Sequence, residues 1–234
     1  LEAMYDTIAL LDALGVDEIR VIRTTETPRW RTNGGDLTLG IIEYYDQMLE
    51  LIRRCLSSAF TISVDIWQFV HIRTPKRSYS FHPVQSSCAK YRDGIPACRG
   101  VRGTVAVSYS GEVYPSFGNG MVTPLYRLLN NSRYLELVSM PVSDIRTANS
   151  TCRGCQYWNC CMGGCRAIAL AFTKDYRHFD PAKCAFFKGG YMQKLDDIFK
   201  SAPISYSCRS ETGNMARAGE PANIRALLSE FQQL

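Results

Sequence analysis

Six of the ten cysteines fall in one stretch of the chain, at Cys152, Cys155, Cys160, Cys161, Cys165 and Cys184. The pairs Cys152/Cys155 and Cys161/Cys165 have the spacing at which loops present metal ligands. Thiolates placed side by side are usually held by a bound metal centre. A Gly-Gly dipeptide at 163–164 is expected to let the backbone approach a bulky cluster without Cβ clashes. The stretch therefore predicts an iron–sulfur site.

Composition limits the class of protein. The chain of 234 residues allows one or two domains, and 46% hydrophobic and 21% charged residues are ordinary for a globular protein. No apolar run reaches the roughly 18 residues of a membrane span, and no secretory leader is visible. The net charge of +5 is spread out, with only short basic clusters at 53–54 and 76–77. Such short clusters are typical of a solvated surface, so we expect no nucleic acid as a partner. Because no apolar run is long enough to span a membrane, we expect no membrane as a partner either.

The distribution of cysteines separates two further classes. A secreted disulfide protein is usually smaller and carries a signal peptide, whereas here the cysteines crowd at metal-ligand spacing. This favours a cytoplasmic metal protein. Cys55 is predicted to be a core thiol, because it lies on the apolar stripe of a helix expected over 38–57. Structural zinc bound by four of the clustered cysteines is the alternative, since zinc also suits four thiolates.

The first third of the chain reads as part of a parallel sheet. A helical stripe over 4–14 ends at Gly15, and a β-branched strand follows over 16–23. Helix, glycine and strand form half of a βαβ unit, so we expect a preceding portion that carries the partner strands. A further strand is predicted over 60–72, with His71 as a hydrogen-bonded structural histidine.

The loop after the first strand could contact a ligand. In parallel barrels such loops lie on the face that carries the active site. Arg23, Thr24, Thr25 and Glu26 are therefore candidates for contacting a cofactor or substrate. An ordinary turn with a capping threonine explains the same residues.

The remaining chain is predicted to hold short elements around the cysteines. Residues 73–103 read as a loop with Cys88 and Cys98, and 104–115 as a β-hairpin that turns at Ser110-Gly111. One or two helices follow over 125–138. A helix over 181–200 places Cys184 in its first turn, where the helix dipole favours negative charge. A loop from 201 and a last helix from Pro221 complete the chain.

The cysteine spacing resembles a known family. Cys152-x2-Cys155-x5-Cys161-x3-Cys165 with the later Cys184 resembles the SPASM domain of radical SAM enzymes that modify ribosomally made peptides. Cys98, Gly111 and position 116 fall where that pattern has a cysteine, a glycine and a second cysteine. The resemblance covers about residues 86–200, and residues 1–57 resemble the last βα portion of the partial TIM barrel in that superfamily.

The resemblance implies an α/β chain, in which the C-terminal part of a partial TIM barrel is followed by an α+β SPASM iron–sulfur domain. That domain would carry the β-hairpin and C-terminal helices. The implied divisions are 1–72 for the end of the barrel, 73–103 for the linker, 104–200 for the SPASM domain, and 201–234 for the C-terminal loop and helix.

The resemblance also implies two auxiliary 4Fe–4S clusters. Carried over by position, the ligands of the second cluster are Cys152, Cys155, Cys161 and Cys184. Those of the first are Cys98 and Cys165, with Cys88 as an extra ligand, and Cys160 has no counterpart. Ser116 stands where the family has a cysteine, and serine is a poor ligand at neutral pH. The first cluster could thus be incomplete, open at one iron, differently ligated or absent.

The chain lacks the Cys-x3-Cys-x2-Cys motif that binds S-adenosylmethionine with a further 4Fe–4S cluster. Cys161-x3-Cys165 would need a cysteine at 168, where Ile168 stands. In the complete enzyme, the resemblance implies radical removal of hydrogen from a precursor peptide, leading to a crosslink, an oxidised residue or an excised unit. The implied partners are that peptide, the upstream barrel portion, and a reductant such as flavodoxin or ferredoxin. The sequence assigns no catalytic acid or base.

Overall fold

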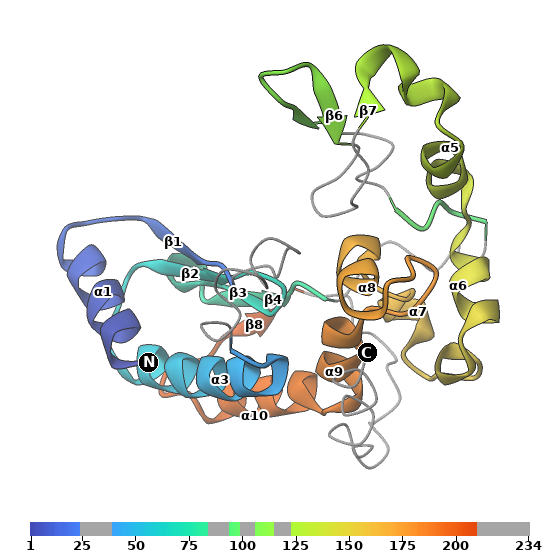
Figure 1. The fold of residues 1–234 in the computed structure, drawn as a ribbon. Helices are drawn as coiled ribbons and strands as arrows, with labels where there is room; N and C mark the ends of the chain where they lie inside the picture. The colour runs from blue at the N-terminus through green and yellow to red at the C-terminus, as the bar shows by residue number, and fades with distance from the viewer. Residues whose placement is uncertain (24–38, 84–93, 99–105, 115–122, 210–234) are drawn as a thin grey trace. The chain divides into compact units, whose positions relative to one another are not determined.

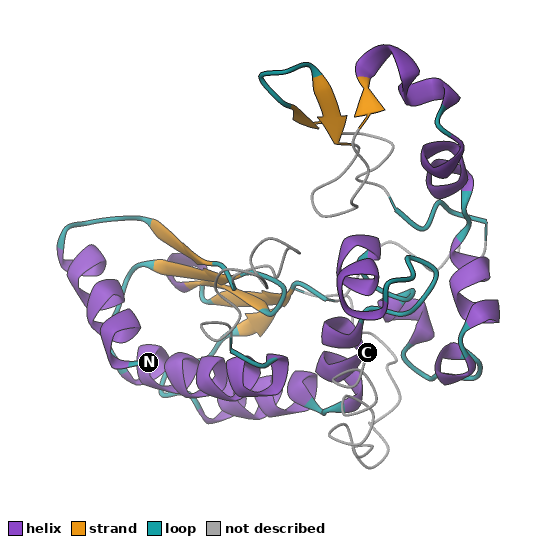
Figure 2. Cartoon of the chain, in the orientation of Figure 1, coloured by secondary structure: helices purple, strands orange, loops and turns teal. Residues whose placement is uncertain are grey.

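The computed structural model describes residues 1–23, 39–83, 94–98, 106–114 and 123–209, which divide into two units. Of these residues, 1–23, 39–83 and 185–209 form the first unit, here called the sheet unit. Residues 94–98, 106–114 and 123–184 form the second, called the cysteine unit. Both combine helices with strands, which confirms the predicted mixed α/β class (Figures 1 and 2).

The sheet unit contains a five-stranded mixed sheet with the order β1-β2-β3-β4-β8. Its strands are β1 (Glu18–Val21), β2 (Ser63–Ile66), β3 (Val70–Arg73), β4 (Ser78–Phe81) and β8 (Ser207–Cys208). β1 and β2 are parallel, as the predicted βαβ unit requires, and so are β4 and β8. β2, β3 and β4 run antiparallel to one another, so the prediction of an all-parallel sheet is wrong.

Three helices belong to the sheet unit: α1 (Glu2–Ala13), α3 (Ile41–Ser57) and α10 (Tyr191–Ser201). Figure 1 shows α3 and α10 side by side along one face of the sheet. The Tyr191 hydroxyl donates to the Asp46 carboxylate over 2.8 Å and fastens α10 to α3. The Asp12 carboxylate accepts from the backbone N–H of Thr61 and of Ile62 at 2.9 and 2.8 Å, which ties α1 to the segment before β2.

Alternation along the strands separates an apolar face from a polar face of the sheet. The apolar side chains are buried, among them Val64, Ile66, Val70, Ile72 and Phe81. Cys55, on α3, is also buried, and burial raises the pKa of its thiol to about 11. The prediction that Cys55 is a core thiol is therefore confirmed.

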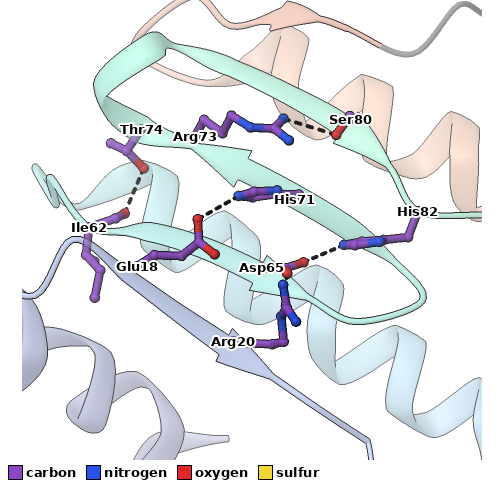
Figure 3. Close-up of polar contacts among 9 residues, drawn as sticks. All are labelled: Glu18, Arg20, Ile62, Asp65, His71, Arg73, Thr74, Ser80 and His82. Carbon is purple, nitrogen blue, oxygen red and sulfur yellow. Dashed lines mark hydrogen bonds and ion pairs between the residues drawn. The ribbon is translucent and has the colours of Figure 1, made fainter. Parts of the chain in front are cut away.

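The polar face centres on Asp65, whose side chain is 1% exposed (Figure 3). One carboxylate oxygen accepts from Arg20 Nε at 2.7 Å, and the other is hydrogen-bonded to His82 Nε2. Burial raises the pKa of Asp65, but His82 and Arg20 outweigh burial and hold that pKa below its usual value. His71 Nε2 lies 3.1 Å from a carboxylate oxygen of Glu18, which confirms His71 as a hydrogen-bonded structural histidine.

Four predicted elements differ from the structure, the first being the loop expected from 201, which contains β8. The strand expected over 60–72 is a β2–β3 hairpin, because Gln68 takes a left-handed conformation (φ +62°) and the Phe69 N–H closes the turn on the Ile66 carbonyl. Residues 74–81, expected in a loop, form a 3-10 turn η2 (Thr74–Lys76) and β4. The helix expected over 181–200 is interrupted at 189–190, where Gly190 has φ +70°.

The cysteine unit consists of a small antiparallel sheet, β5-β6-β7, and short helices. The predicted hairpin is confirmed as β5 and β6, with Gly111 left-handed (φ +79°) in its turn. The elements are β5 (Ala106–Val107), β6 (Glu112–Tyr114), β7 (Thr123–Pro124), η3 (Leu125–Asn130), α5 (Ser132–Ser139), α6 (Val142–Ala148), η4 (Ser150–Cys152), α7 (Trp158–Cys161), α8 (Arg166–Thr173) and the first half of α9 (Pro181–Lys188), whose residues from 185 on belong to the sheet unit.

A buried apolar cluster forms the core of the cysteine unit. Its members include Leu137, Ile145, Trp158, Met162 and Phe179, together with Cys152 and Cys184. Two cysteines of the predicted second ligand set are thus built into the core. In the part of the chain that the structure describes, no helix is long and apolar enough to cross a membrane. The helix predicted from Pro221 lies outside the described residues.

Candidate metal centre

A tight turn brings Cys152 and Cys155 onto one loop. The Cys155 N–H donates to the Cys152 carbonyl at 3.3 Å, and the Cys152 N–H donates to the Asn149 carbonyl at 3.0 Å. Gly154 allows the turn to close because it is left-handed (φ +71°), a conformation that is unfavourable for other residues. The predicted loop-type pair therefore lies on a hydrogen-bonded turn.

Asn149 anchors this turn to the core. Its side chain is buried and donates from Nδ2 to the carbonyls of Ile145 and Arg177, at 2.6 and 2.9 Å. The first bond holds the end of α6, and the second reaches a segment 28 residues further along. A buried amide with both donors satisfied fixes the direction in which the chain enters the turn.

A left-handed run joins Cys161 to Cys165. Met162, Gly163 and Gly164 have φ values of +48°, +74° and +76°. A Cβ on Gly163 would lie 2.5 Å from Ile145 Cγ2, and one on Gly164 would overlap the side chain of Asp180. The glycines were predicted to make room for a cluster. Among the described residues, the groups for which they make room are Ile145 and Asp180.

Asp180 connects this run to the helix that carries Cys184. Its carboxylate accepts from the Cys165 N–H at 2.9 Å and from the Lys183 N–H at 3.0 Å, and its own N–H donates to the Gly163 carbonyl at 2.8 Å. Asp180 thereby caps α9, with a proline at the first helical position. Cys165 and Cys184 are thus positioned by one carboxylate.

Arg166 also stabilises the left-handed run at 162–164, by hydrogen bonds to backbone carbonyls. Its guanidinium is buried and donates to the carbonyls of Gly163, Gly164, Tyr176 and His178. Burial lowers the pKa of Arg166, while the nearby Asp180 carboxylate acts in the opposite direction. A charge this deeply buried is tolerated when its donors are paired, so the Arg166 side chain fixes the loop around Cys165.

Burial and neighbouring charges act on the thiols of Cys161 and Cys165. Burial raises the pKa of Cys161 to about 12, and a negative charge on Cys152 would raise it further. Cys165 is exposed, but desolvation by the surrounding protein raises the pKa of its thiol, with Asp180 and Cys98 adding to this effect. Charges on Cys161, Cys165 and Cys98 also act on Arg166, so these three thiols and the buried guanidinium influence one another.

Backbone N–H groups act on two of the sulfurs, one before the start of α8 and one at the end of α7. Cys165 precedes α8, and the backbone N–H groups of Ala167 and Ile168 lower the pKa of its thiol, without the geometry of a full capping bond. The Gly163 N–H acts in the same way on Cys161. Backbone N–H groups directed at sulfur favour the thiolate, which is the form that binds metal.

The described residues do not form a complete set of ligands around one metal position. Within the described ranges, no three cysteine, histidine, aspartate or glutamate side chains are placed so that they could hold a metal ion together. Cys88 and Ser116 lie outside those ranges. The ligand sets therefore stay predictions.

The core of the cysteine unit contains a buried hydrogen-bond donor that could bond to sulfur. Trp158 Nε1 is buried and has no hydrogen-bond partner among the described residues. Thiolate and sulfide sulfurs accept such bonds. Together with the clustered thiols and the N–H groups directed at them, this donor fits a thiolate-bound metal centre.

The candidate cofactor contacts near the first strand are only partly described. Arg23 Nη2 donates to the Leu39 carbonyl at 3.1 Å. Thr24, Thr25 and Glu26 lie outside the described residues. Their expected role in binding a cofactor or substrate stays a prediction.

Sequence reasoning missed the residues that position the cysteines. Asp180 had a local signal, because an aspartate before a proline is typical of a helix start. Arg166 is the one charged residue in the run Arg-Ala-Ile-Ala-Leu-Ala-Phe, which indicates a buried, paired charge. Asn149 had no such signal. Searches against protein-family models and curated proteins give no match for the chain.

Proposed function

We propose that this chain is the C-terminal part of a radical SAM/SPASM enzyme that modifies a ribosomally made peptide. The observation that carries the proposal is the arrangement of the cysteines of the predicted sets. Five of them lie on a C-x2-C turn (Cys152 and Cys155), at the two ends of a left-handed run (Cys161 and Cys165), and in the first turn of α9 (Cys184). The partial barrel and the SPASM domain are the finer architecture that this proposal implies.

In this proposal, Cys152, Cys155, Cys161 and Cys184 hold one cluster, while Cys98 and Cys165, with Cys88, hold another. When bound, the auxiliary 4Fe–4S clusters would pass on single electrons or hold the peptide during its radical modification. Asp180 and Arg166 fix the backbone that presents Cys165 and Cys184. Because its surroundings raise the pKa of the Cys161 thiol, metal binding there would release a proton.

Single cysteine replacements test the ligand assignment. In anaerobically purified protein, Cys155→Ala should lose about four iron atoms per chain, the content of one 4Fe–4S cluster. Cys160→Ala is the matched control, because it removes a thiol from the same segment that belongs to neither set. Equal iron loss in the two variants would reject the assignment. Loss of a single zinc ion from Cys155→Ala would instead support the structural zinc module.

A further inference from the structure

The indole of Trp158 is a buried donor without an acceptor. The residue is 3% exposed, and Nε1 has no hydrogen-bond partner among the residues that the structure describes. An unsatisfied buried donor costs about 1–3 kcal/mol. Tryptophan is normally buried where its N–H has a partner. The position of Trp158 therefore points to an acceptor supplied by a bound group.

Trp158 lies in the chain between Cys155 and Cys161, two members of the second predicted ligand set. Trp158 belongs to the same buried cluster as Cys152 and Cys184. Its backbone N–H donates to the Cys155 carbonyl at 3.0 Å, and Cys161 lies three residues later on α7, on the same helical face. Most side-chain acceptors in this cluster are sulfur atoms.

Arg146 helps to define the orientation of the ring. Its guanidinium carbon lies 5.6 Å from the centre of the Trp158 ring, at a distance typical of a cation–π contact. This contact uses the π system of the indole. The Nε1–H group, in the plane of the ring, takes no part in it and remains available as a donor.

We propose that the Trp158 N–H donates a hydrogen bond to a sulfur of the centre bound by Cys152, Cys155, Cys161 and Cys184. This inference rests on the proposed function. Such a bond stabilises the more negatively charged, reduced state of a cluster, so it raises the reduction potential. Trp158 is thus a residue that tunes the centre without ligating it.

The test uses protein in which the tryptophans carry 15N in the indole. Pulsed electron paramagnetic resonance of the dithionite-reduced protein should show a 15N coupling to the cluster. Trp158→Phe should abolish this coupling and make the reduction potential more negative, because the aromatic ring stays but the donor is lost. Trp67→Phe and Trp30→Phe are controls and should keep the coupling.

The outcomes separate this inference from the proposed function. A reduced cluster without 15N coupling, or a coupling that persists in Trp158→Phe, would overturn the role of Trp158 alone. Protein that binds no iron–sulfur cluster would overturn both. The measurement on labelled wild-type protein needs no variant, so misfolding of Trp158→Phe cannot hide the answer.

Discussion

Replacing Gly164 by alanine tests how the loop before Cys165 is held. The new Cβ would overlap Asp180 Cβ and lie 2.7 Å from Asp180 Oδ2. The backbone at φ +76° is also unfavourable for alanine. Asp180 cannot retreat without stretching its bonds to the N–H groups of Cys165 and Lys183.

The expected loss of stability follows from these contacts. A left-handed backbone costs alanine about 1–2 kcal/mol, and overpacking costs about 1–3 kcal/mol. Weakening one hydrogen bond to the buried carboxylate adds about 1.5–3 kcal/mol. Gly164→Ala should therefore lower the free energy of unfolding by about 4–8 kcal/mol, which is comparable to the whole stability of a small domain.

The assay is urea unfolding of the metal-loaded protein, followed by tryptophan fluorescence. Gly154→Ala is the matched control, because Gly154 has φ +71° but no atom within 4 Å of the added Cβ. It should cost only about 1–2 kcal/mol. Should Gly164→Ala fail to fold, Asp180→Gly in the same chain should partly restore stability. Equal losses for Gly164→Ala and Gly154→Ala would refute the reasoning.

Three further predictions concern other parts of the chain. Arg166→Met should cost about 3–5 kcal/mol, because it removes the donors to four backbone carbonyls and one of the two cations that act on the Asp180 carboxylate; an unchanged urea midpoint would contradict this. Asp65→Asn should destabilise the sheet unit by about 1.5–3 kcal/mol near neutral pH. Because the folded pKa of Asp65 is lowered, this difference should be present above the unfolded pKa of about 3.9 and disappear as the pH falls through the folded value. A loss that does not vary with pH would contradict it. Ser116→Cys should raise the iron content if the first set lacks only one ligand, and unchanged iron would reject that explanation.

Regular patterns in the sequence predicted the regular elements. The apolar stripes of α1 and α3 follow the helical period, and glycines mark the end of α1 and the turn between β5 and β6. The β2–β3 turn could not be found in this way, because Gln68 adopts a left-handed conformation that its residue type does not favour. The interruption between α9 and α10 was not predicted, because the apolar stripe continues across it. The Gly-Gly dipeptide at 189–190 was a signal for it.

In the candidate site, too, the local turn could be predicted from the sequence, whereas the contacts between distant segments could not. The spacing of Cys152 and Cys155 predicted a local turn, since the four residues from 152 to 155 suffice to form it. The contributions of Asp180 and Arg166 depend on segments 10–15 residues away along the chain, and only the fold places those segments beside the Gly-Gly run. Local patterns carry no information about such contacts.

The most direct test of the central claim is the metal content and colour of anaerobically purified protein. The proposal predicts brown protein with broad absorption near about 400 nm, and with iron and acid-labile sulfide in equal amounts. Colourless protein with stoichiometric zinc and no sulfide would contradict it.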